Sequence, residues 1–265
     1  MSFVYREVDG LGFYEVSGWR GASGIFTTRR GGKSGPPYDS LNLGPGGGDS
    51  PEVVGENRAL LAGALGLGTG MLKTVRQVHG TEVYVLKDPD AGPPLDGYDA
   101  VITGLAGPAV GVLTADCVPI LLYDPAGRAV GAVHAGWAGT VGGIAGSAVR
   151  AMAAEYGSKP EDILAAIGPS IGPCCYEVDE KVVSPLMRNV RIDDGLINAT
   201  RPGHWLLDLW ETNVRMLVSA GMPRANITVM GLCTACNTSR FYSHRGSGGR
   251  TGRMMAVARL LPDGK

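Results

Sequence analysis

The stretch VGVLTADCVPILLY, residues 110–123, decides the fold, because two apolar runs suited to buried strands enclose the polar cluster TADC at residues 114–117. Strand-like runs also cover residues 72–78 and 129–133, and helix-like stretches alternate with strand-like ones along the chain. Short apolar runs bounded by turn signals are typical of strands with both faces buried. We therefore predict an α/β (α+β) protein with β-sheet at its core.

Further elements follow from local patterns. Ser50 can cap a helix that has Pro51 at its first position and runs to about residue 65. Helical spacing of apolar residues predicts two more helices, over residues 139–156 and 208–220. Further strands are expected at residues 100–103, 163–167, 227–230 and 254–260. The 42 glycines are spread along the chain, and no linker or repeat divides it, so we predict a single domain over residues 1–265.

Three potential metal ligands lie where strand-like runs end or are interrupted: His79, Cys117 and His134. A thiolate with two imidazoles suits zinc, and three protein ligands leave a fourth tetrahedral position open, as in catalytic sites. The spacing matches no short zinc signature, and each residue taken singly is more typical of a packed core position. The three together form the hypothesis of a catalytic zinc site.

The composition limits the classes of protein. With 44% hydrophobic residues and a net charge of -1, the chain can bury a large core and has no basic surplus for nucleic acid. No apolar run has transmembrane length, and residues 1–7 lack the pattern of a signal peptide. We expect a cytoplasmic protein, monomeric, with no membrane or nucleic-acid partner.

Four other cysteines allow a second metal hypothesis: Cys174, Cys175, Cys233 and Cys236. Only one CxxC unit is present, and vicinal cysteines rarely bind one tetrahedral ion together. Packing is therefore the expected role of these side chains, with a structural zinc site as the alternative. The pattern is not that of a secreted disulfide framework.

Several ordered motifs carry a family resemblance: QVHG at residues 77–80, ADCVPI at 115–120, VHAGW at 133–137, IGPSIGPCCY at 167–176 and FYSHR at 241–245. Near the start, FTTR at 26–29, SLNLG at 40–44 and NR at 57–58 belong to the same set. In this order the motifs resemble the laccase-domain family of purine nucleoside phosphorylases, also called the YfiH-like or polyphenol oxidase family. The resemblance covers residues 24–260 approximately.

The resemblance implies a layered sandwich of mixed sheets flanked by helices, with zinc held by His79, Cys117 and His134. It also implies phosphorolysis of adenosine, inosine, guanosine and methylthioadenosine, with adenosine deamination as a second activity. Two positions depart from the family pattern, because Ala138 and Gly246 stand where basic residues are usual. Binding of phosphate could then be weaker or depend on Arg250 or Arg253.

The remaining candidate residues follow from the motifs and from chemistry. Bound zinc would act as a Lewis acid and lower the pKa of water to about 7, which suits attack at C6 of adenine. Asp116 is a candidate proton shuttle or orienting residue, although strand alternation would direct it away from Cys117, and His244 is a candidate proton donor. The candidates for substrate binding are Arg58 and Arg245 with Arg30 behind them for phosphate, Tyr176 and Phe241 for a flat base, and Asn42 and Gln77.

Alternatives from other functional classes stay open at this point. Cys117 and His134 could be the nucleophile and base of a cysteine hydrolase. A copper ion could replace zinc and support phenol oxidation, whereas four histidines are too few for a full multicopper oxidase. A metal-stabilised binding protein without enzymatic activity is the third alternative.

Overall fold

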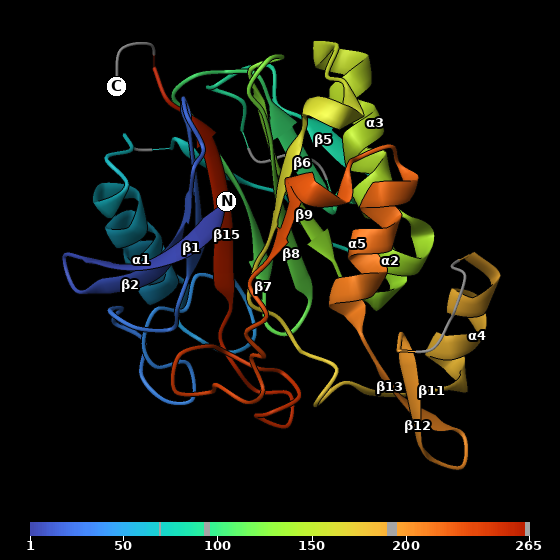
Figure 1. Cartoon of the computed structure of the whole chain (residues 1–265). Helices are drawn as coiled ribbons and strands as arrows, with labels where there is room; N and C mark the ends of the chain where they lie inside the picture. Colours follow the sequence, from blue (N-terminus) through green and yellow to red (C-terminus); the bar gives the residue numbers. More distant parts are fainter. Residues whose placement is uncertain (69, 93–95, 190–194, 263–265) are drawn as a thin grey trace.

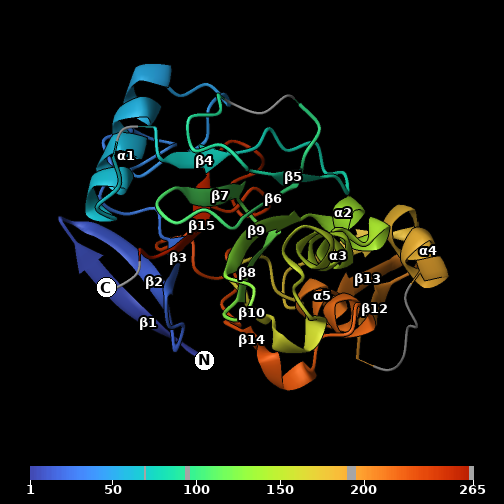
Figure 2. The same ribbon diagram turned by 90° about the horizontal axis from the view of Figure 1, so that it is seen from above.

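Two six-stranded sheets lie face to face, and helices cover their outer faces, in the computed structural model of the chain (Figures 1 and 2). The structure describes residues 1–68, 70–92, 96–189 and 195–262. The predicted layered α/β sandwich with mixed sheets is confirmed. No described helix combines the length and apolar character needed to cross a bilayer.

The first sheet has the order β1-β2-β3-β15-β7-β4. Its strands are β1 (Ser2–Val8), β2 (Leu11–Ser17), β3 (Ala22–Thr27), β15 (Met254–Leu260), β7 (Ala109–Thr114) and β4 (Leu72–Thr74). The pair β4 and β7 is parallel, and the other described pairs are antiparallel. Helix α1 (Pro51–Ala64) packs on the outer face through the buried Leu61. Ser50 caps this helix by accepting from the Val53 amide, as predicted.

The second sheet has the order β14-β10-β8-β9-β6-β5. Its strands are β14 (Ile227–Val229), β10 (Leu164–Ile167), β8 (Val118–Asp124), β9 (Ala129–Ala135), β6 (Ala100–Thr103) and β5 (Val83–Val85). Helices α2 (Trp137–Gly142), α3 (Ile144–Tyr156) and α5 (Leu209–Ser219) cover its outer face (Figure 2). Two single-turn 3-10 helices, η1 (Pro160–Asp162) and η2 (Arg224–Asn226), precede β10 and β14.

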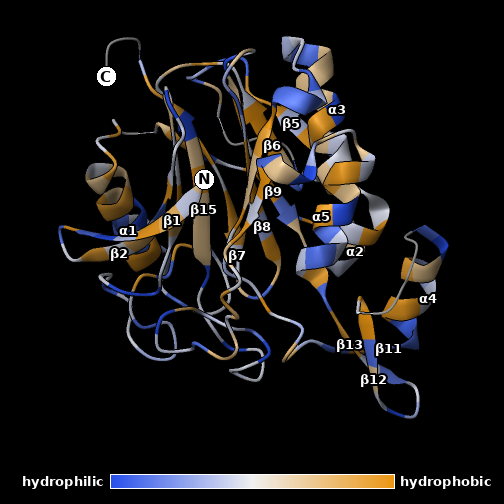
Figure 3. Ribbon diagram, in the orientation of Figure 1, coloured by the Kyte–Doolittle hydropathy of each residue, from blue (hydrophilic) through white to orange (hydrophobic). Residues whose placement is uncertain are grey.

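Side chains of β8 alternate between two apolar layers. Leu121 and Tyr123 pack between the sheets, whereas Ile120 and Leu122 pack under the helices. Because neighbouring side chains of a strand point to opposite faces, a strand inside a sandwich is apolar at every position. The hydrophobic colour of the central strands in Figure 3 follows this pattern.

The structure differs from the predicted elements in three places. The helix predicted over residues 139–156 is two helices, because Gly143 adopts a left-handed φ of 87° that ends α2. The strand predicted at residues 72–78 ends at Thr74. A third, antiparallel sheet was not predicted: β11 (Glu177–Asp179), β13 (His204–Leu207) and β12 (Ile197–Arg201), with helix α4 (Glu180–Asn189) beside it.

Candidate metal centre and substrate cavity

The two sheets bring His79, Cys117 and His134 together. Cys117 directly precedes β8, and His134 lies on the neighbouring strand β9, opposite Pro119. His79 comes from the loop that follows β4, and its Nε2 lies 3.8 Å from the Cys117 Sγ. The candidate ligand atoms of all three residues lie within 4.8 Å of one another. The cluster is therefore assembled from the loop after β4, the residue before β8 and the neighbouring strand β9 of the second sheet.

Asp99, which precedes β6, holds both histidines. Its Oδ1 accepts from the His134 Nδ1 at 2.8 Å and from the His79 backbone amide at 2.9 Å. Its Oδ2 accepts from the backbone amides of Val78 and Gly80 at 3.1 and 2.6 Å. With Nδ1 engaged as a donor, His134 presents Nε2 toward the cluster. Orienting the ring in this way is the usual role of a carboxylate behind a metal-binding histidine.

The charges of Asp99, Cys117 and His134 depend on one another. Burial alone would raise the pKa of Asp99, but the hydrogen bond from His134 and those from backbone amides lower it. Burial likewise opposes ionisation of Cys117, yet the charge and hydrogen bonds of His134 and His79 lower its pKa to about 6. Burial disfavours charge on His134, but Cys117 and Asp99 raise its pKa to about 9. Both shifts favour a Cys117 thiolate beside a protonated His134 ring at neutral pH.

The geometry of the three donors fits a tetrahedral cation. With Zn–S near 2.3 Å and Zn–N near 2.0–2.1 Å, a sulfur and a nitrogen on one zinc ion are about 3.6 Å apart, close to the 3.8 Å between Cys117 and His79. A Cβ at Gly136 would lie 2.8 Å from the His79 ring and 3.3 Å from the Cys117 Sγ. Glycine at position 136 therefore leaves room for the cluster. Three donors leave a fourth position open.

A cavity of about 850 Å³ opens from this cluster. A volume of this size accommodates a small-molecule substrate. Six of the other predicted site residues line it: Arg58, Gln77, Asp116, Tyr176, His244 and Arg245. His244 is exposed at this cavity, and Tyr176 is half-buried. The structure thus brings the three candidate metal ligands and most of the predicted substrate residues to one place.

Asp116 connects three loops at the cavity. Its side chain accepts hydrogen bonds of 2.6 Å from the Thr234 hydroxyl and the Arg245 amide, and its carbonyl accepts from the Ile171 amide. The expectation from strand alternation was wrong, because Asp116 has a left-handed φ of 85° and lies outside any strand. Asp116 and Cys117 therefore both face the cavity.

Arg58 is a cation without an acidic partner among the described residues. It reaches the cavity from α1, and its Nη2 donates to the Thr74 hydroxyl at 2.9 Å. Its buried Nε lacks a hydrogen-bond partner, and burial lowers the pKa of its guanidinium. A buried, incompletely paired guanidinium favours an anionic ligand. Arg253 also lines the cavity, whereas Arg250 is absent from its lining.

Gln77 lines the cavity but is already engaged. Its side-chain amide donates to the Leu113 carbonyl and accepts from the Leu113 amide, at 2.8 and 2.7 Å. In this way it extends the pairing of β4 with β7 beyond Thr74. Arg245 donates to the Glu177 carbonyl at 3.0 Å, and its guanidinium lies 5.5 Å from the centre of the Tyr176 ring.

Three predicted substrate-binding residues lie outside this lining. Phe241 is fully buried in the core, so the structure does not place it against a ligand in the cavity. Asn42 is buried and bonds to Asp49 and to the backbone of Gly44 and Arg253. Arg30 is exposed and borders a separate, smaller hollow. The contacts that the structure shows for these three side chains are with the protein itself.

Sequence reasoning missed Asp99. The sequence signal at Asp99 resembles that of the histidines, because Asp99 is a polar residue at one end of an apolar run, residues 100–103. Asp99 is fully buried, which is rare for a carboxylate without partners. The four other cysteines, for which packing was the expected role, lie together in one group in the structure.

Comparisons with known proteins place this architecture in a family. The model of the family described as "multi-copper polyphenol oxidoreductase laccase" matches residues 23–261. The chain belongs to this family. A "purine nucleoside phosphorylase YlmD" of Geobacillus stearothermophilus is 39% identical over 258 residues, covering 91% of this chain and 94% of that protein.

Other relatives agree. A "purine nucleoside phosphorylase" of Deinococcus radiodurans is 41% identical over 238 residues, covering 89% of this chain and 88% of that protein. The crystal structure of YlmD from Geobacillus stearothermophilus has a TM-score of 0.91 at 37% identity and covers 97% of this chain and 98% of its own. A hypothetical protein YfiH of Bacillus licheniformis matches with the same TM-score at 36% identity, with the same coverage. The predicted family resemblance is confirmed.

Proposed function

We propose that this protein is a zinc-dependent purine nucleoside phosphorylase, which converts a nucleoside and phosphate into a free base and ribose 1-phosphate. The observation that carries the proposal is one cavity bordered by a three-donor metal cluster and by the incompletely paired cation Arg58. The names of the relatives support the same reaction. Adenosine, inosine, guanosine and methylthioadenosine are the substrates to test.

Phosphate binding is the proposed role of Arg58, with Arg253 and Arg245 near it. Phosphorolysis requires a phosphate oxygen to attack C1′ of the ribose while the bond from C1′ to the purine nitrogen breaks. Guanidinium groups hold phosphate through paired hydrogen bonds and can position that oxygen. Arg253 then stands in for the basic residues replaced by Ala138 and Gly246, and its backbone amide is held by Asn42.

The purine is proposed to lie near Tyr176, whose aromatic ring faces the cavity between Arg245 and the metal cluster. The departing purine takes up a proton, and exposed His244 is the candidate donor. Asp116 is proposed as a positioning residue for Arg245, since both of its oxygens already accept hydrogen bonds. An Asp116→Asn variant with unchanged turnover and zinc content would remove it from the machinery.

Zinc fits His79, Cys117 and His134 and would supply a Lewis acid at the end of the cavity. The family description refers to copper, but this chain has four histidines, of which two belong to the cluster. That number does not provide the imidazoles of a multicopper site. A single copper ion in the same cluster is the competing occupant, and elemental analysis separates the two metals.

The test measures adenosine turnover with and without phosphate, with zinc content determined on the same preparation. Phosphorolysis predicts phosphate-dependent release of adenine and ribose 1-phosphate, lost in Cys117→Ala. Inosine formed without phosphate would show the adenosine deaminase activity that we propose as a side reaction. Zinc-replete protein that converts no purine nucleoside under either condition would refute the proposal and favour a metal-stabilised binding protein.

One observation favours a second candidate, a cysteine hydrolase. Asp99, His134 and Cys117 form a chain in which the carboxylate orients the imidazole and the imidazole lies beside a thiol of lowered pKa. This is the logic of a nucleophile, base and orienting acid. Metal content distinguishes the two, because metal-free protein alkylated rapidly at Cys117 would support the hydrolase.

A further inference from the structure

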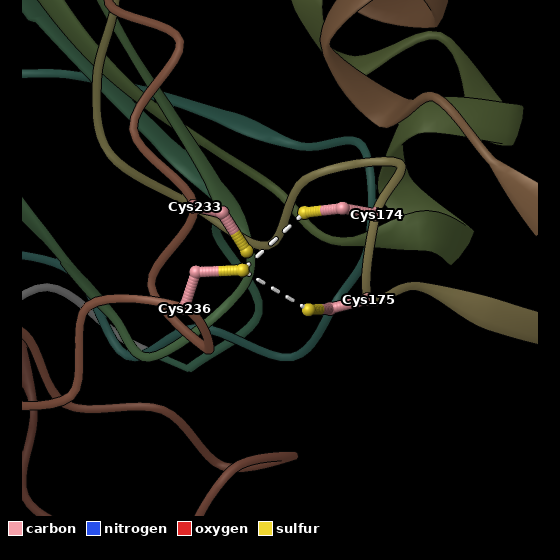
Figure 4. A group of neighbouring side chains, drawn as sticks. All are labelled: Cys174, Cys175, Cys233 and Cys236. Atoms are coloured by element: carbon pink, nitrogen blue, oxygen red, sulfur yellow. Dashed lines mark hydrogen bonds between the residues drawn. The ribbon is translucent and has the colours of Figure 1, made fainter.

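A second cluster of metal-binding side chains lies outside the cavity lining. Cys174, Cys175, Cys233 and Cys236 come from two loops, and their sulfur atoms all lie within 4.8 Å of one another. Figure 4 shows one pair of side chains approaching from each loop and all four sulfurs converging. The Cys236 Sγ lies 3.5 Å from that of Cys174 and 3.4 Å from that of Cys175.

We infer that these four cysteines form a separate structural zinc site, which ties together the two loops that carry Tyr176 and Arg245. Four thiolates in tetrahedral arrangement are a closed ligand set, the arrangement of structural zinc. With Zn–S near 2.3 Å, two sulfurs on one zinc are about 3.8 Å apart. The two shortest contacts, at 3.5 and 3.4 Å, are slightly below this value, and all four sulfurs lie within 4.8 Å of one another, so small side-chain rotations suffice to bind the ion.

The vicinal pair can serve one ion because it lies in a turn. Neighbouring side chains of a strand point to opposite faces, but the amides of Cys175 and Tyr176 both donate to the Gly172 carbonyl, at 3.0 and 3.1 Å. This turn directs the two adjacent thiols to the same side. The usual objection to vicinal cysteines as ligands of one ion therefore does not apply here.

Backbone contacts hold the two loops in register beside the cluster. The Ser170 amide donates to the Leu232 carbonyl, and the Thr234 amide donates to the Ser170 carbonyl, at 3.3 and 3.0 Å. The Gly172 amide points at the Cys233 sulfur, 3.3 Å away, and an amide donor stabilises a thiolate ligand. This framework presents two ligands from each loop.

A disulfide is the competing explanation, and the geometry argues against it. A disulfide joins two sulfurs about 2.05 Å apart, whereas Cys236 is nearly equidistant from two partners at 3.4 and 3.5 Å. Cys236 could form a disulfide with only one of these two partners. A cation uses all four.

The consequence concerns the cavity. The first loop continues from the cluster into Tyr176, and the second continues to His244 and Arg245, all of which line the cavity. Zinc bound by the four cysteines would fix these two loops relative to each other. The ion itself would lie away from the reacting atoms. The four cysteines would then be positioning residues.

Zinc counting on matched variants tests this inference. The chain has five cysteines, four in this cluster and Cys117 in the other, so Cys117→Ser and Cys236→Ser each remove one ligand from a different site. With both sites present, the wild type holds two zinc ions, each variant holds one, and the double variant holds none. X-ray absorption on Cys117→Ser should then report four sulfur ligands at about 2.3 Å.

Other outcomes separate the two proposals. One zinc in the wild type that is lost in Cys117→Ser and kept in Cys236→Ser overturns the structural site. One zinc lost only in Cys236→Ser supports it and refutes the catalytic zinc. Visible absorption of an iron–sulfur cluster, or a mass lower by two hydrogens from a disulfide, would also overturn it.

A measurement on the unmodified chain covers the case in which Cys236→Ser does not fold. Cys174 and Cys236 are exposed, so free thiols at these positions are accessible to a maleimide. Bound zinc should protect them, and a chelator should release their reactivity. Rapid labelling of both residues before any chelator is added would contradict the inference.

Discussion

The two clusters of candidate metal ligands are supported by the fold in different ways. Cys117 and His134 stand beside and within strands of one sheet, His79 lies on the loop after β4, and fully buried Asp99 bonds to the His134 ring and to the His79 backbone amide. The four cysteines stand on surface loops and have backbone turns as support. The first cluster has three donors and opens into a cavity, whereas the second has four donors and is closed. Donor number and support are the reasons for proposing catalysis at the first cluster and a structural role for the second.

The largest expected effect separates the clusters by activity. Removing a ligand from the open site removes a Lewis acid worth several kcal/mol, so Cys117→Ala should lower kcat/KM for phosphorolysis by about 10³-fold or more. Cys236→Ser should lower it much less, because it acts through the loops. Steady-state kinetics on folded protein, with the zinc content of each variant determined, checks both. Equal losses in the two variants would abolish the distinction between a catalytic and a structural cluster.

A smaller effect is expected from the support of the open site. Asp99→Asn replaces the carboxylate that orients His134, and changes to such a partner typically cost 10–100-fold in metal affinity or activity. Zinc titration with a competing chelator measures the affinity directly. Asp90→Asn, at an exposed acidic residue outside the cavity lining, is the matched control. Unchanged zinc affinity in Asp99→Asn would mean that the backbone alone holds the histidines.

Phosphate recognition should respond at Arg58. Arg58→Lys keeps the charge but loses the paired donors, and one charge-assisted hydrogen bond of about 1.5 kcal/mol corresponds to roughly a tenfold rise in KM for phosphate. The KM for the nucleoside should change less. Arg150→Lys, on the exposed side of α3, serves as the control. A rise in the KM for the nucleoside alone would mean that Arg58 contacts the base or the ribose and not the phosphate.

The smallest effect concerns the loop of the four-cysteine cluster where it enters β11. Hydrogen bonds from Arg201 and Thr200 lower the pKa of Glu177 to about 2. A lowered folded-state pKa stabilises the fold above the unfolded value of about 4.3, and this contribution is lost as pH falls through about 2. NMR titration of the Glu177 carboxyl should place its midpoint near 2 in the wild type and higher in Arg201→Gln. A midpoint near 4.3 in the wild type would show that this edge of the small sheet is not ordered by the pair.

Local patterns predicted most of the central elements. The strands at residues 100–103 and 254–260 have the predicted bounds, and α1 begins at its predicted cap. The small sheet with α4 was missed because it forms at the side of the molecule, where half-exposed strands lack a continuous apolar run. The break at Gly143 was missed because apolar spacing continues through it, while the glycine backbone turns.

The candidate site was predicted by residue type and located by the fold. His79, Cys117 and His134 could be proposed because polar residues at the ends of apolar runs need partners, and the structure brings their donor atoms together. Phe241 could not be separated from Tyr176 in the same way. Both are aromatic and both lie in motifs, yet one is fully buried and the other faces the cavity.

The sequence by itself determined the α/β class, the family and the chemical nature of the donors, because these depend on residue type and on periodicity along the chain. Only the tertiary structure decided that Asp99 holds both histidines and that four cysteines, 58 or more residues apart between the two pairs, meet at one point. Cys174 and Cys175 illustrate the reason. Their directions depend on a turn closed at Gly172 and on loops paired across the molecule, and such long-range contacts leave no periodic signal in the chain.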